Sequence, residues 1–261
     1  MKHHDEAIER YVARVSGDQT TLAVIVSGSL ARGAERAISD VDLYLLVTTE
    51  RWDAAYRDNL LMYVETDGAD YPGGYFDVKL ATLEYLDDAA ARGDDPVRDS
   101  FAHTRIAFSR IDDLQERLDR VASVPESTWD SHIASFLAQA RLHADYFLVQ
   151  GYEAGDRILT AHAAVHLVTS ASRLLLAHNR VLFAGPKYLA KTVAGLPLKP
   201  AGWDELVERV LADPTPATSH ALLAALEDYE PWPLTADHTL SRFILDNELA
   251  WRYRTKTPEY S

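Results

Sequence analysis

The stretch that decides the fold is VSGSLARG at residues 26–33, followed by SDVDLYLLV at residues 39–47. The residues just before it, 21–27, are mostly apolar and β-branched and predict a buried strand. Gly28 then stands where this strand gives way to a short helix. Residues 41–47 form another apolar run, which predicts a second strand. A strand, a tight turn, a short helix and a strand therefore follow one another.

Gly28 and Ser29 have the properties of a phosphate site. Glycine has no Cβ, so a phosphate group can come close to the backbone at residue 28. The start of a helix at Ser29 offers unpaired N–H groups and the positive end of the helix dipole to an anion. Both features predict that this turn binds a negatively charged group.

Three aspartates are candidates for a metal site. Asp40 and Asp42 are two residues apart at the start of a strand, so their side chains leave the same face. Like charges held side by side repel each other unless a cation compensates them, and carboxylate oxygens suit Mg²⁺. Asp77 lies within a predicted strand at residues 75–80. If that strand is the neighbour of residues 41–47, the three carboxylates meet around a pair of metal ions.

Gly28-Ser29, ten intervening residues, Asp40-Val41-Asp42 and a later third carboxylate resemble the signature of the DNA polymerase β-like nucleotidyltransferase superfamily. The resemblance covers roughly residues 22–80. The overall build is similar to that of small bacterial enzymes that adenylylate a hydroxyl of an aminoglycoside or lincosamide antibiotic. The resemblance implies that Ser29, with Gly28, holds the phosphates of the nucleotide. It also implies that Asp40, Asp42 and Asp77 are the catalytic carboxylates, that they ligate two Mg²⁺ ions, and that ATP is the co-substrate.

Cationic side chains near these motifs have two interpretations each. Arg32 is three residues past Ser29 on the same helix face, where it contacts the triphosphate or is simply solvated. Lys79 shares a strand face with Asp77 and neutralises phosphate or pairs with a carboxylate. Lys187, in FAGPKY at residues 183–188, reaches a phosphate or belongs to a structural turn.

The general base and a possible second metal site are less defined. Asp77 is a candidate base as well as a ligand, and Asp145, Glu153 and Asp156 are alternatives from the second half of the chain. His162 and His166 have a spacing that can bind zinc, but their segment carries no glutamate base and no evident third ligand. We interpret these two histidines as packed or hydrogen-bonded side chains.

The two halves of the chain differ in their predicted secondary structure. Further strands are expected at 75–80 and 104–109, with helices at 4–16, 51–61, 83–91 and 112–121. A linker at 121–128 contains a proline and small polar residues. Beyond it the pattern is helical, at 131–150, 156–179, 202–212, 216–228 and 236–253. We therefore predict an α/β (α+β) catalytic domain with a mixed sheet at residues 1–122 and an all-helical substrate-binding domain at 129–261.

Composition narrows the possible partners. The chain has 26 basic and 40 acidic residues, a net charge of −14, and no run of Lys and Arg. This argues against a nucleic-acid partner and suits a small or cationic acceptor. There is no cysteine, so disulfides and thiolate chemistry are excluded. The N-terminal MKHHDE lacks the apolar core of a signal peptide and no stretch is long enough to cross a membrane, so a cytoplasmic protein without a membrane partner is expected.

The expected reaction is transfer of a nucleoside monophosphate, with AMP from ATP as the expected donor, to a hydroxyl of a small molecule, with release of pyrophosphate. An antibiotic acceptor and a role in antibiotic resistance follow from the resemblance alone. Two alternatives stay open. One is a nucleotidyltransferase that modifies a protein, as some antitoxins do, and the other is a nucleotide-binding module without catalysis.

Overall fold

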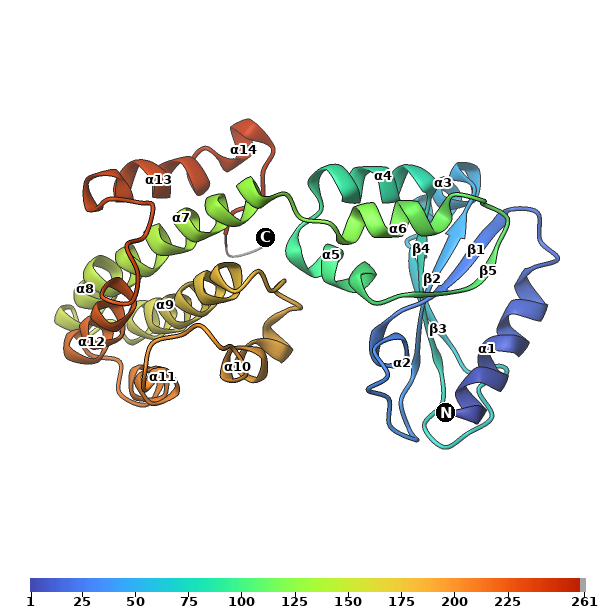
Figure 1. Ribbon diagram of the computed structural model, residues 1–261, viewed down its shortest axis with the longest axis horizontal. Coiled ribbons are helices and arrows are strands. Elements are labelled where there is room, and N and C mark those ends of the chain that lie inside the picture. The colour runs from blue at the N-terminus through green and yellow to red at the C-terminus, as the bar shows by residue number, and fades with distance from the viewer. Residues whose placement is uncertain (259–261) are drawn as a thin grey trace. The chain divides into compact units, whose positions relative to one another are not determined.

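The computed structural model describes residues 1–258 (Figure 1). The chain divides into two compact units, Met1–Ser123 and Val124–Ser261. This division falls inside the linker expected at residues 121–128. No helix of the described residues is long and apolar enough to cross a bilayer.

The first unit is built on a five-stranded sheet with the order β3-β4-β2-β1-β5. Strands β2 and β4 are parallel, whereas β1–β2, β1–β5 and β3–β4 are antiparallel, so the sheet is mixed as predicted. The strands are β1 Thr21–Val26, β2 Val41–Val47, β3 Met62–Glu65, β4 Phe76–Ala81 and β5 Arg105–Ser109.

Helices cover both faces of this sheet (Figure 1). They are α1 Lys2–Val15, α2 Gly28–Ala31, α3 Thr49–Arg57, α4 Leu83–Arg92, α5 Asp95–Ala102 and α6 Leu114–Ala122. Buried residues of α1 pack with Leu43 and Leu45 of β2 in one core cluster. Tyr44 and Leu46 belong to the opposite cluster, with residues of α4, α5 and α6. This alternation along β2 is the two-residue period of a strand that is buried on both faces.

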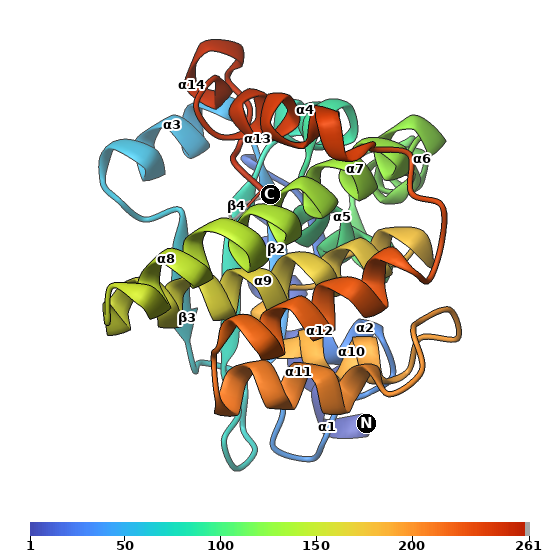
Figure 2. The same ribbon diagram turned by 90° about the vertical axis from the view of Figure 1, so that its left-hand side faces the viewer.

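The regular elements in the described residues of the second unit, 124–258, are all helices, as predicted (Figure 2). Its elements are α7 Glu126–Leu142, the π-helix η1 His143–Phe147, α8 Leu148–Glu153, α9 Arg157–His178, α10 Pro186–Ala194, α11 Trp203–Ala212, α12 Pro216–Glu227, the 3-10 helix η2 Ala236–His238, α13 Thr239–Asp246 and α14 Ala250–Tyr253. Residues of α7 and α9 contribute most of its apolar core, including Phe136, Leu137, Leu167 and Leu174.

Several elements differ from the sequence-based expectation. Strand β3 and helices α5 and α10 were not predicted, and α3 ends at Arg57 rather than near residue 61. The helix expected at 131–150 contains the π-helix at its centre. None of these differences changes the predicted fold class.

Candidate active site

Asp42 and Asp77 lie side by side on neighbouring strands. The parallel pairing of β2 with β4 places Asp42 directly opposite Asp77, and paired strands are about 4.8 Å apart. The pairing of these two strands, which the sequence analysis required, is thus present. Strand β4 lies between β3 and β2 rather than at the sheet edge. Both carboxylates therefore stand on the sheet face that α4, α5 and α6 partly cover.

Gly28 is pressed against the carboxylate of Asp42. A Cβ at residue 28 would lie 1.9 Å from Oδ2 of Asp42, which no side chain can do, and the backbone φ of Gly28 is +64°. The backbone N–H of Ser27 also donates to the carbonyl oxygen of Asp42, at 3.0 Å. Only glycine allows the start of α2 to pack this closely on the Asp42 side chain. Ser29 follows in the first turn of α2.

Asp40 comes from the loop before β2, and its carboxylate interacts with the Tyr75 hydroxyl. A hydrogen-bonding contribution from Asp40 and its negative charge raise the pKa of the Tyr75 hydroxyl above its ordinary value. The loop is fixed at the neighbouring residue, where the Tyr71 hydroxyl donates to the carbonyl oxygen of Ser39 at 2.9 Å and His4 Nε2 lies 3.2 Å from the same atom. The sequence analysis overlooked Tyr75, although its two-residue spacing from Asp77 puts both side chains on one face.

The burial and the negative charges of the three aspartates favour the binding of a cation. Burial raises the pKa of Asp42, the negative charges of Asp40 and Asp77 raise it further, and Lys79 and Arg32 lower it. Oδ1 of Asp77 is buried and has no hydrogen-bond partner. A buried carboxylate oxygen without a donor costs free energy that a bound cation would recover.

These residues fit a hard divalent cation, since their oxygens are the ligands that Mg²⁺ prefers. Within residues 1–258, no group of three or more His, Asp and Glu side chains is already arranged as a metal site. Asp42 and Asp77 form a pair, and Asp40 is engaged with Tyr75.

Two of the predicted cationic residues lie close to this carboxylate pair. Arg32 is the residue that ends α2, and its Nη2 forms an ion pair with Oδ2 of Asp99 at 2.5 Å. Lys79 is two residues past Asp77 on β4, with Nζ 5.9 Å from the ring centre of Tyr44. Both act on Asp42 through their charge, and Asp99 is a partner that the sequence did not indicate.

The other candidates belong to the second unit. Lys187 is exposed in the first turn of α10, with Nζ 5.5 Å from the ring centre of Tyr188. Asp156 caps α9 by accepting hydrogen bonds from the backbone of Ile158 and Leu159. Glu153 is exposed at the end of α8. Asp145 lines a pocket of this unit.

His162 and His166 pack together as expected. Their ring centres are 4.1 Å apart, and each faces the buried His143 of η1, at 5.7 Å and 5.1 Å. This third histidine was not recognised from the sequence.

No protein-family model and no curated protein matches this sequence. Among solved structures, the chain is similar to a nucleotidyltransferase-like protein from Exiguobacterium sibiricum 255-15, with 12% sequence identity and a TM-score of 0.49. The match covers 96% of this chain and 79% of that one.

Proposed function

We propose that this protein is a magnesium-dependent nucleotidyltransferase, with its catalytic residues in the first unit. The observation that carries the proposal is the pairing of Asp42 with Asp77 in register, with Gly28 packed on Asp42 and Oδ1 of Asp77 left without a donor. Carboxylates held together at the cost of mutual repulsion are typical of a site that binds a cation and a phosphate together.

Each residue has a distinct role in this proposal. Asp42 and Asp77 hold Mg²⁺, and Asp40 joins them from the loop before β2. Bound Mg²⁺ neutralises phosphate charge as it develops. Gly28 lets the start of α2 pack against Asp42. The N–H groups and hydroxyl of Ser29 contact the phosphates of the nucleotide. Arg32 is a proposed further ligand of these phosphates.

The reaction is an in-line displacement at the α-phosphorus of a nucleoside triphosphate, for which we propose ATP. An acceptor hydroxyl oxygen forms the new bond to phosphorus, the bond to the bridging oxygen breaks, and pyrophosphate leaves. The hydroxyl proton passes to a carboxylate, for which Asp77 is the candidate in this unit. We propose a small-molecule acceptor, and antibiotics of the aminoglycoside and lincosamide classes are the first to test.

The test is pyrophosphate release from ATP and Mg²⁺ in the presence of an acceptor library. Asp42→Asn and Asp77→Asn are each expected to reduce turnover at least about 100-fold, because each removes a negative charge opposite the proposed cation. Asp70→Asn is the matched control, since the Asp70 side chain is 78% exposed in the same unit. Retention of turnover in Asp42→Asn would disprove the mechanism.

Two further measurements on the same protein distinguish the alternative functions, a protein-modifying enzyme and a binding module without catalysis. A nucleotide adduct on a co-expressed protein, seen by mass spectrometry, would identify a protein acceptor instead of a small molecule. Calorimetric binding of ATP without a steep Mg²⁺ requirement, together with no pyrophosphate release, would identify a binding module.

A further inference from the structure

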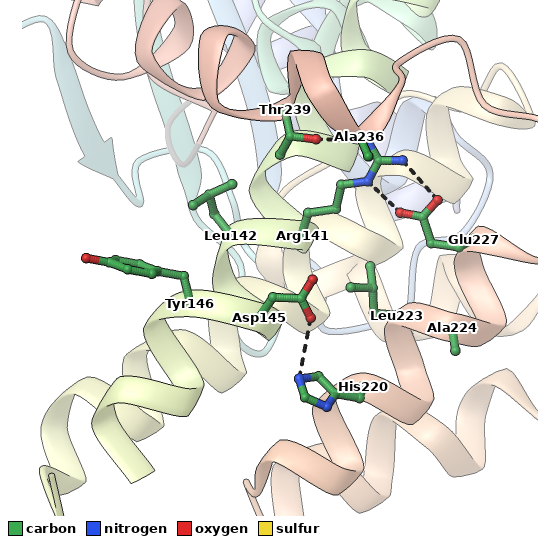
Figure 3. Close-up of a pocket in the computed structure, with 10 residues that line it drawn as sticks. All are labelled: Arg141, Leu142, Asp145, Tyr146, His220, Leu223, Ala224, Glu227, Ala236 and Thr239. Atoms are coloured by element: carbon green, nitrogen blue, oxygen red, sulfur yellow. Dashed lines mark hydrogen bonds and ion pairs between the residues drawn. The ribbon is translucent and has the colours of Figure 1, made fainter. Parts of the chain in front are cut away.

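A pocket of about 470 Å³ lies within the second unit (Figure 3). Its volume is in the range of small-molecule sites. Three segments line it, the junction of α7 with η1, the helix α12, and the segment from η2 to the start of α13. Leu142, Leu223, Ala224 and Ala236 give it an apolar lining. Its ionisable side chains are Arg141, Asp145, Tyr146, His220 and Glu227.

Arg141 and Glu227 form a bidentate ion pair in the pocket wall. Nε of Arg141 donates to Oε1 of Glu227 at 2.5 Å, and Nη2 donates to Oε2 at 2.9 Å. The remaining nitrogen, Nη1, donates to the carbonyl oxygen of Leu234 at 3.0 Å and to Oγ1 of Thr239 at 2.9 Å. All three guanidinium nitrogens are therefore engaged, and the two charges cancel. This pair ties α7 to α12 and α13 and leaves little charge for a ligand.

Asp145 is the second carboxylate of the pocket. Figure 3 shows it between Arg141 and His220, with its carboxylate turned to the imidazole. Oδ1 of Asp145 is 3.4 Å from Nε2 of His220, a partner that is charged only when protonated. Burial raises the pKa of Asp145, the charge of Glu227 raises it further, and His220 and Arg141 lower it. With a neutral imidazole, the pocket keeps a net negative charge at this carboxylate.

The π-helix η1 places Asp145 at this position. Within its single wide turn, His143 is buried in the helical unit while Asp145 is exposed and lines the pocket. Tyr146 is 50% exposed, and Figure 3 shows its ring directed away from Asp145 and His220. π-helical turns often occur at functional sites.

We infer that this pocket binds a small organic cation with an apolar body, whose ammonium group pairs with Asp145. A single carboxylate beside apolar walls suits an amine better than a metal ion, which takes more oxygen ligands. The apolar body would pack on Leu142, Leu223 and Ala224. This site is a feature of the second unit alone and does not depend on nucleotidyl transfer.

The test compares two probes that differ in charge, 2-phenylethylamine and 2-phenylethanol, against the full chain without nucleotide or Mg²⁺. Titrations followed by amide NMR are expected to show at least tenfold tighter binding of the amine, with shifts at Leu223 and Ala224. Equal affinities, no binding of the amine, or shifts confined to other residues would overturn the inference.

Substitution of Asp145 tests whether its negative charge binds the amine. Asp145→Asn is expected to lower the affinity for the amine to that for the alcohol, and to leave the affinity for the alcohol unchanged. The matched control is Asp228→Asn, which removes an exposed carboxylate just past the end of α12. Equal loss of amine binding in both variants would also overturn the inference. If Asp145→Asn does not fold, the two-probe comparison on the unmodified protein still decides it.

Discussion

Gly28 and Gly33 have the same backbone φ of +64°, but their surroundings differ. A Cβ at residue 28 meets the Asp42 carboxylate, whereas a Cβ at residue 33 meets nothing within 4 Å. Alanine at either position pays about 1–2 kcal/mol for the left-handed conformation. Only at residue 28 must a proposed catalytic carboxylate also move.

We therefore expect Gly28→Ala to reduce nucleotidyl transfer at least about 100-fold, because Asp42 is displaced from its place beside Asp77. Gly33→Ala should lower the melting temperature by a few degrees and keep most of the activity. Steady-state kinetics and thermal melts on both variants provide the measurement. Equal activity losses would mean that backbone strain, not the Asp42 contact, explains the glycine at residue 28.

His143 makes stability depend on pH. Burial, and to a smaller extent the charges of His166 and His162, lower its pKa to about 3, whereas an unfolded histidine has a pKa near 6.5. The unfolded chain therefore binds this proton more readily than the folded chain between these values. The contribution of neutral His143 to the free energy of unfolding is therefore fully present above about pH 6.5. It is lost as the pH falls toward 3, by up to about 1.4 kcal/mol per pH unit.

His143→Phe should accordingly reduce the loss of unfolding free energy between pH 6.5 and 4.5. Urea denaturation at several pH values measures it, and the comparison is with His238→Gln, which changes an exposed histidine of η2. A pH dependence that is the same in both variants would contradict the assignment to His143.

The site could be predicted from sequence to the extent that its residues are close in the chain or occur at regular strand spacing. The motif around Gly28 and the spacing of Asp40 and Asp42 were visible directly. The pairing of Asp77 with Asp42 needed a long-range contact, which the apolar pattern of both strands favoured. Asp99 was missed, because an ion pair between side chains from different elements has no signature in a single sequence. Tyr75 was overlooked, although its spacing from Asp77 indicates that both side chains share a face.

At the level of elements, Arg98 of α5 joins the ends of two other helices. It is 5% exposed and donates to the carbonyl oxygens of Ala90 and Gly93 at the end of α4. It also donates to those of Val121 and Ser123 at the end of α6. A cation at these positions satisfies unpaired helix carbonyls and interacts favourably with both helix dipoles.

Arg98→Met keeps the aliphatic stem and removes all four of these interactions, so it should destabilise the protein by roughly 2–4 kcal/mol. Arg92→Met is the control, since the Arg92 side chain is 76% exposed and forms an ion pair with Asp88 within α4. It should cost under about 0.5 kcal/mol. Chemical denaturation measures both, and similar losses would show that Arg98 does not hold these helices together.

Two of the elements that were not predicted, β3 and α5, have a weak pattern of apolar residues. Strand β3 has only four residues, and both Met62 and Val64 are at least half exposed, so no buried apolar run marks it. Helix α5 begins in an acidic segment that reads as a solvated loop. Asp94 nevertheless accepts a hydrogen bond from the backbone of Val97, with Pro96 in the first turn. These are start signals of a helix, but too few apolar residues follow them for a periodic pattern.

At the scale of the whole molecule, each apolar core belongs to one unit. The two clusters that sandwich the sheet consist of residues from Met1–Ser123, and the helical cluster consists of residues from Val124 onward. Each unit thus buries its own apolar surface, which is the condition for folding alone.

We expect residues 1–123 and 124–261, expressed separately, each to unfold in one cooperative transition. Because Gly28, Ser29 and the three aspartates all belong to the first fragment, it should bind a non-hydrolysable ATP analogue in a Mg²⁺-dependent manner. The second fragment should bind no nucleotide but keep the amine pocket. Circular dichroism and calorimetry provide the measurements. A first fragment that folds but binds the analogue equally well with and without Mg²⁺ would argue against these aspartates as metal ligands.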